Sequence, residues 1–412
     1  MARRNFDLGI EAHNTGNYSD AFELYLLALD EDTGGYAEYN IAILYINGQG
    51  VSQSDEEAVK WYTRASQKGN LQAHNNLGLM YKQGKGVDRD FEVAFNLFLS
   101  AAEEGYMYAQ CNLGGMYYFG EGVAYSYENA FKWYSKAAEQ GYEEAQYRVG
   151  CMYYFGEGVT HSYENAFNFF SKAAEQGHIS AKNNLATMYE TGQAREQNEQ
   201  KAVELYKETA LLNDANGQNN LANMYNRGRG VHQNFQEAFK WYHKAAQQGY
   251  VRAQESVAYM LLKGKGVKKD YNRSLFWYLE AAEEGDGAAQ YGVGILYELG
   301  LGTEQSFSEA LYWYTESFNS GYIPALNRLA YFYLIGKGVE KDINKAIELF
   351  KKAASKGDFM AIEVLNILDP EDKSSKGLLR EIEKAILDEV IESLGEQIGG
   401  YIAETIANRG KK

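Results

Sequence analysis

Apolar residues recur along most of the chain at intervals of three and four, the spacing that places side chains on one face of an α-helix. Residues 108–119 show this pattern, with an apolar face made of Ala109, Leu113, Met116 and Tyr117. Residues 126–140 have a second apolar face, made of Ala130, Trp133, Tyr134, Ala137 and Ala138. No window alternates apolar and polar residues over the length of a strand. The pattern predicts an all-α fold.

This helix pair recurs with a period of 36 residues. Nine units follow one another from Gly34 to Gly357, and counting positions from Gly34 shows how regular they are. Position 15 is glycine in all nine units, position 12 is tyrosine in eight, and all five tryptophans lie at position 28. Self-similarity at such a period indicates stacked repeats. Because a two-helix unit cannot bury its apolar face alone, we expect a right-handed α/α superhelical solenoid of stacked two-helix repeats with a concave groove.

The ends of the helices carry their own signals. The first helix of the third unit is expected to end at Gly-Glu-Gly-Val (120–123), since glycine adopts the left-handed conformation that terminates helices. Every second helix is preceded by Ser, Asp or Asn, the side chains that accept a hydrogen bond from the free amides of a helix start. Ser54 with Glu57, and Ser306 with Glu309, are spaced for the fuller capping box, in which the glutamate also bonds back to the serine amide.

Composition narrows the functional classes. The chain has 412 residues and a formal net charge of −16, which argues against binding nucleic acid or an anionic membrane. Two cysteines cannot form a disulfide framework. No apolar segment at the N-terminus resembles a secretory signal, and no apolar run is long enough to span a membrane. We therefore expect a cytoplasmic protein without a membrane span, and non-classical export to a host stays an open alternative.

The residues of the third unit resemble the Sel1-like repeat family, relatives of tetratricopeptide repeats. The matching positions are Ala109, Leu113, Gly114, Met116, Tyr117, Gly120, Gly122, Val123, Ala130, Trp133, Tyr134, Ala137, Ala138 and Gly141. The resemblance covers residues 34–357, whereas residues 1–33 look like a tetratricopeptide helix pair and residues 358–412 form a half-repeat and a capping region. It implies a scaffold or adaptor that holds other proteins. The alternatives are a regulatory module of a partner enzyme and a translocated bacterial effector.

No motif points to catalysis. The Gly-x-Gly turns follow helices, whereas phosphate-binding loops follow strands, so they are expected to be structural. The six histidines lack metal-ligand spacing, and no nucleophile motif is present. We expect no catalytic residue, no metal and no cofactor. A hydrolase with a site assembled from distant residues is the less favoured alternative. Cys111 and Cys151 are expected to be free thiols, because stacked helices keep them too far apart for a disulfide.

A helical wheel centred on position 8 of each unit assigns candidate binding residues to the side opposite the buried face. In tetratricopeptide relatives that side lines the concave groove. The third and fourth units place large aromatic residues there: Tyr108, Tyr118, Phe119, Tyr147, Tyr154 and Phe155. Tyrosine is a typical interface anchor, so a protein or peptide partner is one interpretation. Packing of the rings against each other on the inner side of the superhelix is the other.

Position 7, beside the groove, carries mostly asparagine. The residues are Asn40, Asn76, Asn112, Asn184 and Asn220, with Arg148 and Arg328 in two other units. The tetratricopeptide clamp for peptide carboxylates uses asparagine at the matching place, and an amide both donates to and accepts from a peptide backbone. The alternative is a role within the fold, in which the asparagine bonds the neighbouring turn.

The last segment differs from the repeats. Residues 377–408 carry apolar residues at helical spacing, including Leu379, Ile386 and Leu394. A solenoid needs a cap over its last stacking face, so we expect this segment to be an end cap. The alternative is a helix through which two copies of the chain dimerise.

Overall fold

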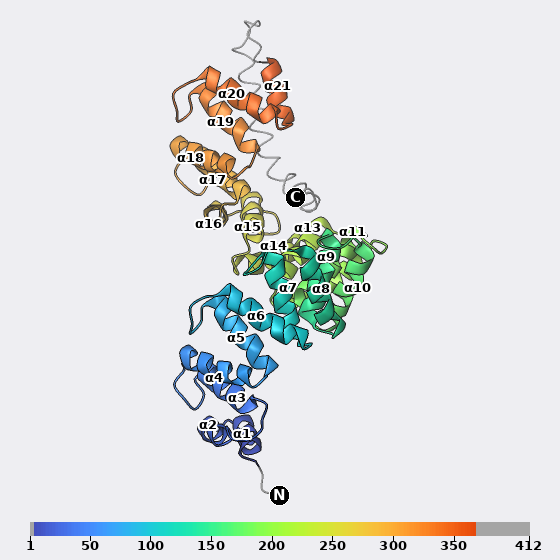
Figure 1. The fold of residues 1–412 in the computed structure, drawn as a ribbon. Coiled ribbons are helices and arrows are strands. Elements are labelled where there is room, and N and C mark those ends of the chain that lie inside the picture. The colour runs from blue at the N-terminus through green and yellow to red at the C-terminus, as the bar shows by residue number, and fades with distance from the viewer. Residues whose placement is uncertain (1–3, 368–412) are drawn as a thin grey trace. The chain divides into compact units, whose positions relative to one another are not determined.

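The computed structural model describes residues 4–367, and every regular element in that range is an α-helix (Figure 1). The expected all-α repeat solenoid is confirmed. The helices form two compact units that divide between Gln197 and Asn198, inside the fifth repeat. The predicted cap or dimerisation helix at 377–408 lies outside the described residues.

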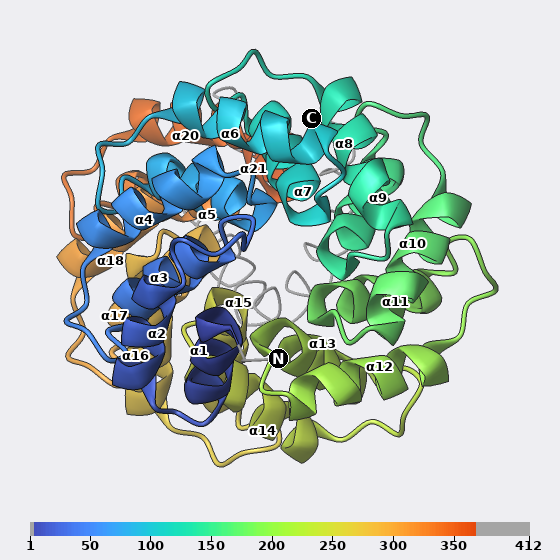
Figure 2. The ribbon, with the colours of Figure 1, turned by 60° about the horizontal axis from the view of Figure 1, so that its bottom comes forward.

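The first unit contains α1 to α11. Their bounds are α1 (Asn5–Asn14), α2 (Tyr18–Leu27), α3 (Tyr36–Asn47), α4 (Asp55–Gln67), α5 (Leu71–Gln83), α6 (Phe91–Glu103), α7 (Met107–Phe119), α8 (Tyr127–Glu139), α9 (Glu143–Phe155), α10 (Tyr163–Glu175) and α11 (Ile179–Thr191). Within this unit, Figure 2 shows α5, α7 and α9 on the inner side of the curve and α6, α8 and α10 on its outer side.

The second unit contains α12 to α21. Their bounds are α12 (Glu199–Leu211), α13 (Ala215–Arg227), α14 (Phe235–Ala246), α15 (Val251–Lys263), α16 (Tyr271–Glu283), α17 (Gly287–Leu299), α18 (Phe307–Asn319), α19 (Pro324–Ile335), α20 (Ile343–Ala354) and α21 (Phe359–Ile367). Each helix packs against the next along the chain, as the repeat pattern requires.

The predicted N-caps form at the start of every second helix. In α8 the Ser126 hydroxyl accepts a hydrogen bond from the Asn129 amide at 3.2 Å. The equivalent Ser, Asp or Asn side chain accepts an amide in each of the other eight repeats. Such a cap typically contributes about 1 kcal/mol to helix stability.

The prediction of a fuller capping box at Ser54 and at Ser306 is wrong. The Ser54 amide, which Glu57 was expected to bond, donates instead to the carbonyl oxygen of Tyr45 at 3.1 Å. The Ser306 amide likewise donates to the carbonyl of Tyr297 at 3.0 Å. This bond ties the start of each second helix to the last turn of the first, so no amide remains there for the glutamate.

The turn between the helices requires glycine for two separate reasons. Gly120 and Gly122 both have left-handed backbones, with φ of 71° and 70°. A Cβ on Gly122 would also lie 2.4 Å from the carbonyl oxygen of Phe91 in the preceding repeat. The fifth repeat keeps this backbone without the glycine, since Ala194 has a φ of 64°. The turn is therefore structural, as expected, and it is strained at Ala194.

The core of each repeat forms where an aromatic ring of the second helix packs on a small residue of the first. The Tyr134 ring would lie 2.9 Å from a Cβ on Gly114, and the Phe170 ring 2.7 Å from one on Gly150. The ring that approaches Gly114 belongs to the second helix of the same repeat. Leu113 and Met116 belong to a separate buried cluster, which they form with Phe98 of the preceding helix and with Trp133.

Candidate functional site

The aromatic residues predicted for the groove meet at the C-terminal ends of α7 and α9. The Tyr118 ring lies 5.0 Å from the Phe119 ring, nearly perpendicular to it. Tyr154 and Phe155 have the same arrangement one repeat later, also at 5.0 Å. Phe119 is 64% exposed and Phe155 50%, whereas both tyrosines are half-buried. The two residues of each pair therefore differ in what they offer a partner.

The tyrosine hydroxyls are bonded to the next repeat. Tyr118 donates to the Glu157 carboxylate at 2.9 Å, and Tyr154 donates to the side-chain carbonyl of Gln193 at 3.0 Å. Burial, and then the bond to Glu157, raise the pKa of Tyr118 above its usual value, so this phenol stays protonated. Burial likewise raises the pKa of Tyr154. These tyrosines hold adjacent repeats together, which favours the internal-packing interpretation for them.

Further rings come from the turn and from the start of the second helix. The Tyr127 ring lies 5.1 Å from that of Tyr118, and Tyr125 lies 5.3 Å from Tyr127. The fourth repeat has matching contacts of 5.2 Å and 4.3 Å. We call these two sets the aromatic rows: Phe119, Tyr118, Tyr127 and Tyr125 in the third repeat, and Phe155, Tyr154, Tyr163 and His161 in the fourth. The helical wheel missed the later members because they lie beyond the first helix. The near-duplicate segments Met116–Ala130 and Met152–Ala166 were the signal that contained them.

The remaining two predicted aromatic residues do not join these rows. Tyr108 lies at the N-terminal end of α7, where its ring is 5.4 Å from Tyr106 and 4.9 Å from Tyr142. Tyr147 stacks on the His178 ring with centroids 4.5 Å apart. Four of the six predicted aromatic residues thus form the same pair in two adjacent repeats, whereas Tyr108 and Tyr147 make other contacts.

Arg148, predicted beside the groove, is already paired. Its Nε lies 2.7 Å from one Glu144 carboxylate oxygen, and His178 Nε2 lies 3.0 Å from the other. His178 Nδ1 accepts from the Ala181 amide, so in the neutral ring Nε2 carries the proton and donates to Glu144. The hydrogen bond from His178, together with Arg148, lowers the pKa of Glu144. Arg148 thus has a carboxylate partner within the protein.

The asparagines at position 7 mostly have partners within the chain. Asn76 donates to the Tyr62 hydroxyl at 3.2 Å, which joins the second repeat to the first. The Asn40 side chain lowers the pKa of Tyr25, which offsets part of the larger rise that burial causes. In the other units Asn112 donates to Asn75 at 2.8 Å, Asn220 accepts from Asn219 at 3.4 Å, and Asn184 is half-buried on α11. These contacts favour the role within the fold over a peptide clamp.

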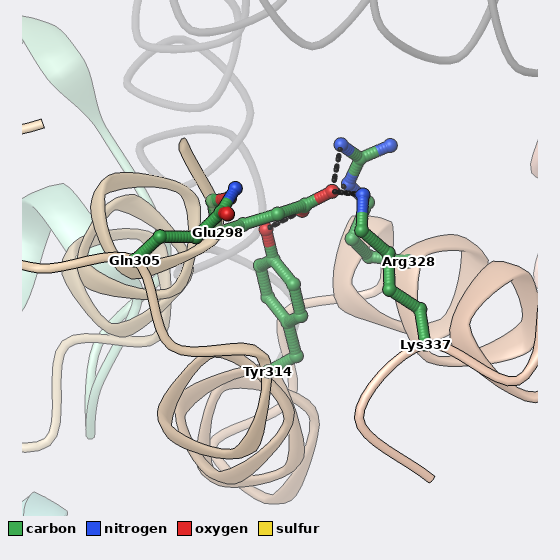
Figure 3. A network of polar contacts seen from close by, with 5 residues as sticks. All are labelled: Glu298, Gln305, Tyr314, Arg328 and Lys337. Atoms are coloured by element: carbon green, nitrogen blue, oxygen red, sulfur yellow. Dashed lines mark hydrogen bonds and ion pairs between the residues drawn. The ribbon is translucent and has the colours of Figure 1, made fainter. Parts of the chain in front are cut away.

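Position 7 of the ninth repeat belongs to a buried charged network that sequence reasoning missed (Figure 3). Arg328 donates to both oxygens of the Glu298 carboxylate, at 2.9 and 3.0 Å, and both residues are 1% exposed. Tyr314 donates to the same carboxylate at 2.6 Å, and Lys337 lies 3.3 Å from it. Burial and the neighbouring Glu298 raise the pKa of Tyr314 well above its usual value. The sequence signal for this network was Glu298 at position 13 of the eighth repeat, followed by Arg328 at position 7 of the ninth.

The two cysteines are free thiols, as expected. Burial raises the pKa of Cys111 to about 12 and that of Cys151 to about 11. Thiols with such pKa values are protonated at neutral pH and react slowly, because the thiolate is the nucleophile.

Over residues 4–367, no group of three or more His, Cys, Asp and Glu side chains is arranged to hold a metal ion. None of the helices in the same range has the length and apolarity needed to cross a membrane.

The fold and these contacts define an α-helical repeat protein whose units are tied together through their first helices. The Sel1 repeat model matches nine times, at residues 35–70, 71–106, 108–142, 143–178, 179–214, 215–250, 251–286, 287–322 and 323–358. The chain belongs to the Sel1 repeat family.

Two solved structures are similar to most of the chain. One is a protective antigen of uropathogenic Escherichia coli strains with an SLR fold, 29% identical, with a TM-score of 0.77 over 97% of this chain and 86% of that one. The other is a Sel1 repeat protein from Oxalobacter formigenes, 30% identical, with a TM-score of 0.57 over 80% of this chain and 93% of that one. The comparison with curated proteins finds no match.

Proposed function

We propose that the protein is a non-enzymatic scaffold that binds a segment of another protein in the groove of its repeats, with the aromatic rows as its main contact. The observation that carries this proposal is the pair of exposed rings at matched places in adjacent repeats, Phe119 and Phe155. The Sel1 repeat fold supports it, because repeats of this kind commonly serve protein–protein interaction.

The tyrosine and phenylalanine rings differ in a way that explains why the phenylalanines would contact the partner. Tyr118 and Tyr154 use their hydroxyls on the next repeat, so their positions serve the fold. Phe119 and Phe155 have no such bond, yet each is held in place by its neighbouring tyrosine ring. Rigid, exposed aromatic side chains lose little entropy on binding and bury a large area, which makes them effective interface anchors.

The asparagines and Arg148 contribute less in this proposal. Most of them already bond other side chains of this chain. A partner would have to displace those bonds, and the net gain of exchanging one hydrogen bond for another is small.

The test is affinity capture of native partners with the Phe119→Ala/Phe155→Ala variant beside the wild-type chain. Phe276→Ala/Tyr312→Ala is the matched control, since it removes two aromatic residues that are 52% and 55% exposed on α16 and α18. We expect proteins that both the wild type and the control retain to be lost from the Phe119/Phe155 variant. Equal recovery by all three folded chains would contradict the proposal. Tyr118→Ala/Tyr154→Ala is a poorer test, because it also removes the bonds between repeats.

A further inference from the structure

The two aromatic rows are one repeat apart, and this distance restricts what can touch both. Packed helices have axes 8–10 Å apart, so equivalent side chains of stacked repeats are separated by about 10 Å. The bond from Tyr118 to Glu157, two residues after Phe155, shows that the rows adjoin one another. A ligand that contacts both phenylalanines must therefore present two apolar groups about 10 Å apart on one side.

Among regular backbone conformations, polyproline II provides this spacing, and a single polyproline II segment is narrower than an α-helix. It rises about 3.1 Å per residue with three residues per turn, so residues i and i+3 lie on one side about 9.3 Å apart. In a β-strand the residues three apart point to opposite faces. An α-helix reaches the distance with residues seven apart, but it is about 10 Å wide and needs a broad apolar surface. The exposed apolar surface here consists of single rings flanked by carboxylates.

The charge around the rows is negative. Residues 117–128 and 153–164 contain four glutamates and neither lysine nor arginine. Lys82 pairs with Glu121 at 2.7 Å, and Arg195 pairs with Glu164. Glu128 accepts only from the Ser126 hydroxyl and Glu157 from Tyr118, so neither carboxylate is neutralised by a basic side chain of the described residues. A cationic side chain would be attracted by both the carboxylates and the ring faces.

We infer that the aromatic rows bind a proline-rich, basic segment in the polyproline II conformation, whose apolar side chains at i and i+3 pack on Phe119 and Phe155. A flanking arginine or lysine lies near Glu128 or Glu157. Proline-rich segments suit aromatic surfaces because their backbone is already extended before binding and loses little entropy. This inference rests on the proposed scaffold function and specifies the chemistry of its partner.

A second copy of the chain does not fit this description. The chain has only two prolines, Pro324 and Pro370. Pro324 occupies the first turn of α19, and the segment around Pro370 reads Leu-Asp-Pro-Glu-Asp, which is acidic. The ligand is therefore not a segment of these 412 residues.

The test is fluorescence anisotropy of the full chain with a labelled peptide, Arg-Pro-Pro-Leu-Pro-Pro-Leu-Pro-Pro-Arg, which places its leucines three apart. The first control peptide has the same composition with the leucines adjacent. The second is an alanine-rich helical peptide with leucines seven apart. We expect saturable binding of the first peptide, at least about tenfold tighter than either control.

Protein variants locate the site. Phe119→Ala/Phe155→Ala should weaken binding about tenfold or more, whereas Phe276→Ala/Tyr312→Ala should leave it unchanged. Glu128→Gln/Glu157→Gln should weaken binding and reduce its salt dependence. The amide introduced by Glu157→Gln would still accept from Tyr118, as Gln193 does from Tyr154, so this variant keeps the bond between repeats.

Three outcomes would overturn the inference: no binding of the proline peptide, equal or tighter binding of a control peptide, or binding that the Phe119/Phe155 variant retains. The proposed function fails separately, if captured partners do not depend on Phe119 and Phe155. Partners that depend on these residues while the proline peptide does not bind would leave the scaffold proposal standing and refute the inference alone.

Discussion

Removing one member of the buried network at Glu298 should cost several kcal/mol of unfolding free energy. Glu298 accepts from Arg328, Tyr314 and Lys337, and its carboxylate has no contact with solvent. Opposite charges about 4 Å apart attract by about 4 kcal/mol at an effective dielectric constant near 20. Breaking a buried pair from one side typically costs about 3–5 kcal/mol, because the remaining charge stays buried and uncompensated.

The two single variants should differ, since Lys337 stands beside the pair. After Arg328→Met, Lys337 still neutralises Glu298, so we expect a loss of about 3 kcal/mol. After Glu298→Gln, Arg328 and Lys337 face each other without a counter-charge, so we expect about 5 kcal/mol. Among residues 4–367, Arg328 Nη1 has no hydrogen-bond partner even in the intact network, which leaves the guanidinium poorly placed to tolerate that loss.

The double variant Glu298→Gln/Arg328→Met tests whether these costs come from one interaction. It should lose about as much as Glu298→Gln alone, about 5 kcal/mol, which corresponds to a coupling energy of about 3 kcal/mol. Glu57→Gln/Lys60→Met, which removes an exposed pair with a 2.6 Å contact, should change stability by less than about 1 kcal/mol.

Urea denaturation followed by circular dichroism measures the free energy of unfolding. Because stacked repeats can unfold in segments, amide hydrogen exchange in α17, α18 and α19 should accompany it. We expect exchange to accelerate there in both single variants, and to accelerate no more in the double variant than in Glu298→Gln. Additive single costs, or a cost below about 1 kcal/mol for Glu298→Gln, would refute this account of the network.

Three smaller changes test the turn and the caps by thermal and urea denaturation. Ala194→Gly should stabilise the chain by about 1 kcal/mol, because it relieves a left-handed backbone at a residue with a Cβ; unchanged or lower stability would contradict that strain. Gly158→Ala should cost more than about 2 kcal/mol, since it has a φ of 67° and its Cβ would meet the Tyr127 carbonyl oxygen; a neutral result would show that the repeats can separate there. Ser126→Ala should cost about 1 kcal/mol while Ser126→Asp retains stability, and equal losses in both would argue against the cap at the Asn129 amide.

The repeat architecture could be predicted from the sequence because its determinants are local and periodic. The cap at Ser126, the turn at Gly120 and the apolar faces of both helices each depend on residues within one unit. Nine copies of the same signals then exclude other interpretations. The capping box at Ser54 failed for the opposite reason. Its amide is taken by Tyr45, nine residues earlier in the preceding helix, and a motif of four residues contains no information about that bond.

The candidate site was predicted less well, because its contacts cross from one repeat to the next. Tyr118 and Phe119 are adjacent aromatic residues near the end of one helix, and the wheel assigns both to the groove. What separates them is Glu157, which lies 39 residues further on and binds only the tyrosine. Position 7 presents the same difficulty. The sequence shows an asparagine there, but it does not show whether that side chain bonds a peptide or, as Asn76 does, the Tyr62 hydroxyl.

The spacing of 39 residues suggests how the sequence could have been interpreted more fully. Position 13 of one repeat meets position 16 of the next in four separate cases: Lys82 with Glu121, Tyr118 with Glu157, Tyr154 with Gln193, and Glu298 with Lys337. Each pair combines a donor with an acceptor, and the polarity is reversed in the last. A donor at one position thus predicts an acceptor at the other. In the described part of the chain, the exposed Phe119 and Phe155 at position 14 have no counterpart of this kind, which is the physical reason for proposing them as contacts for a partner.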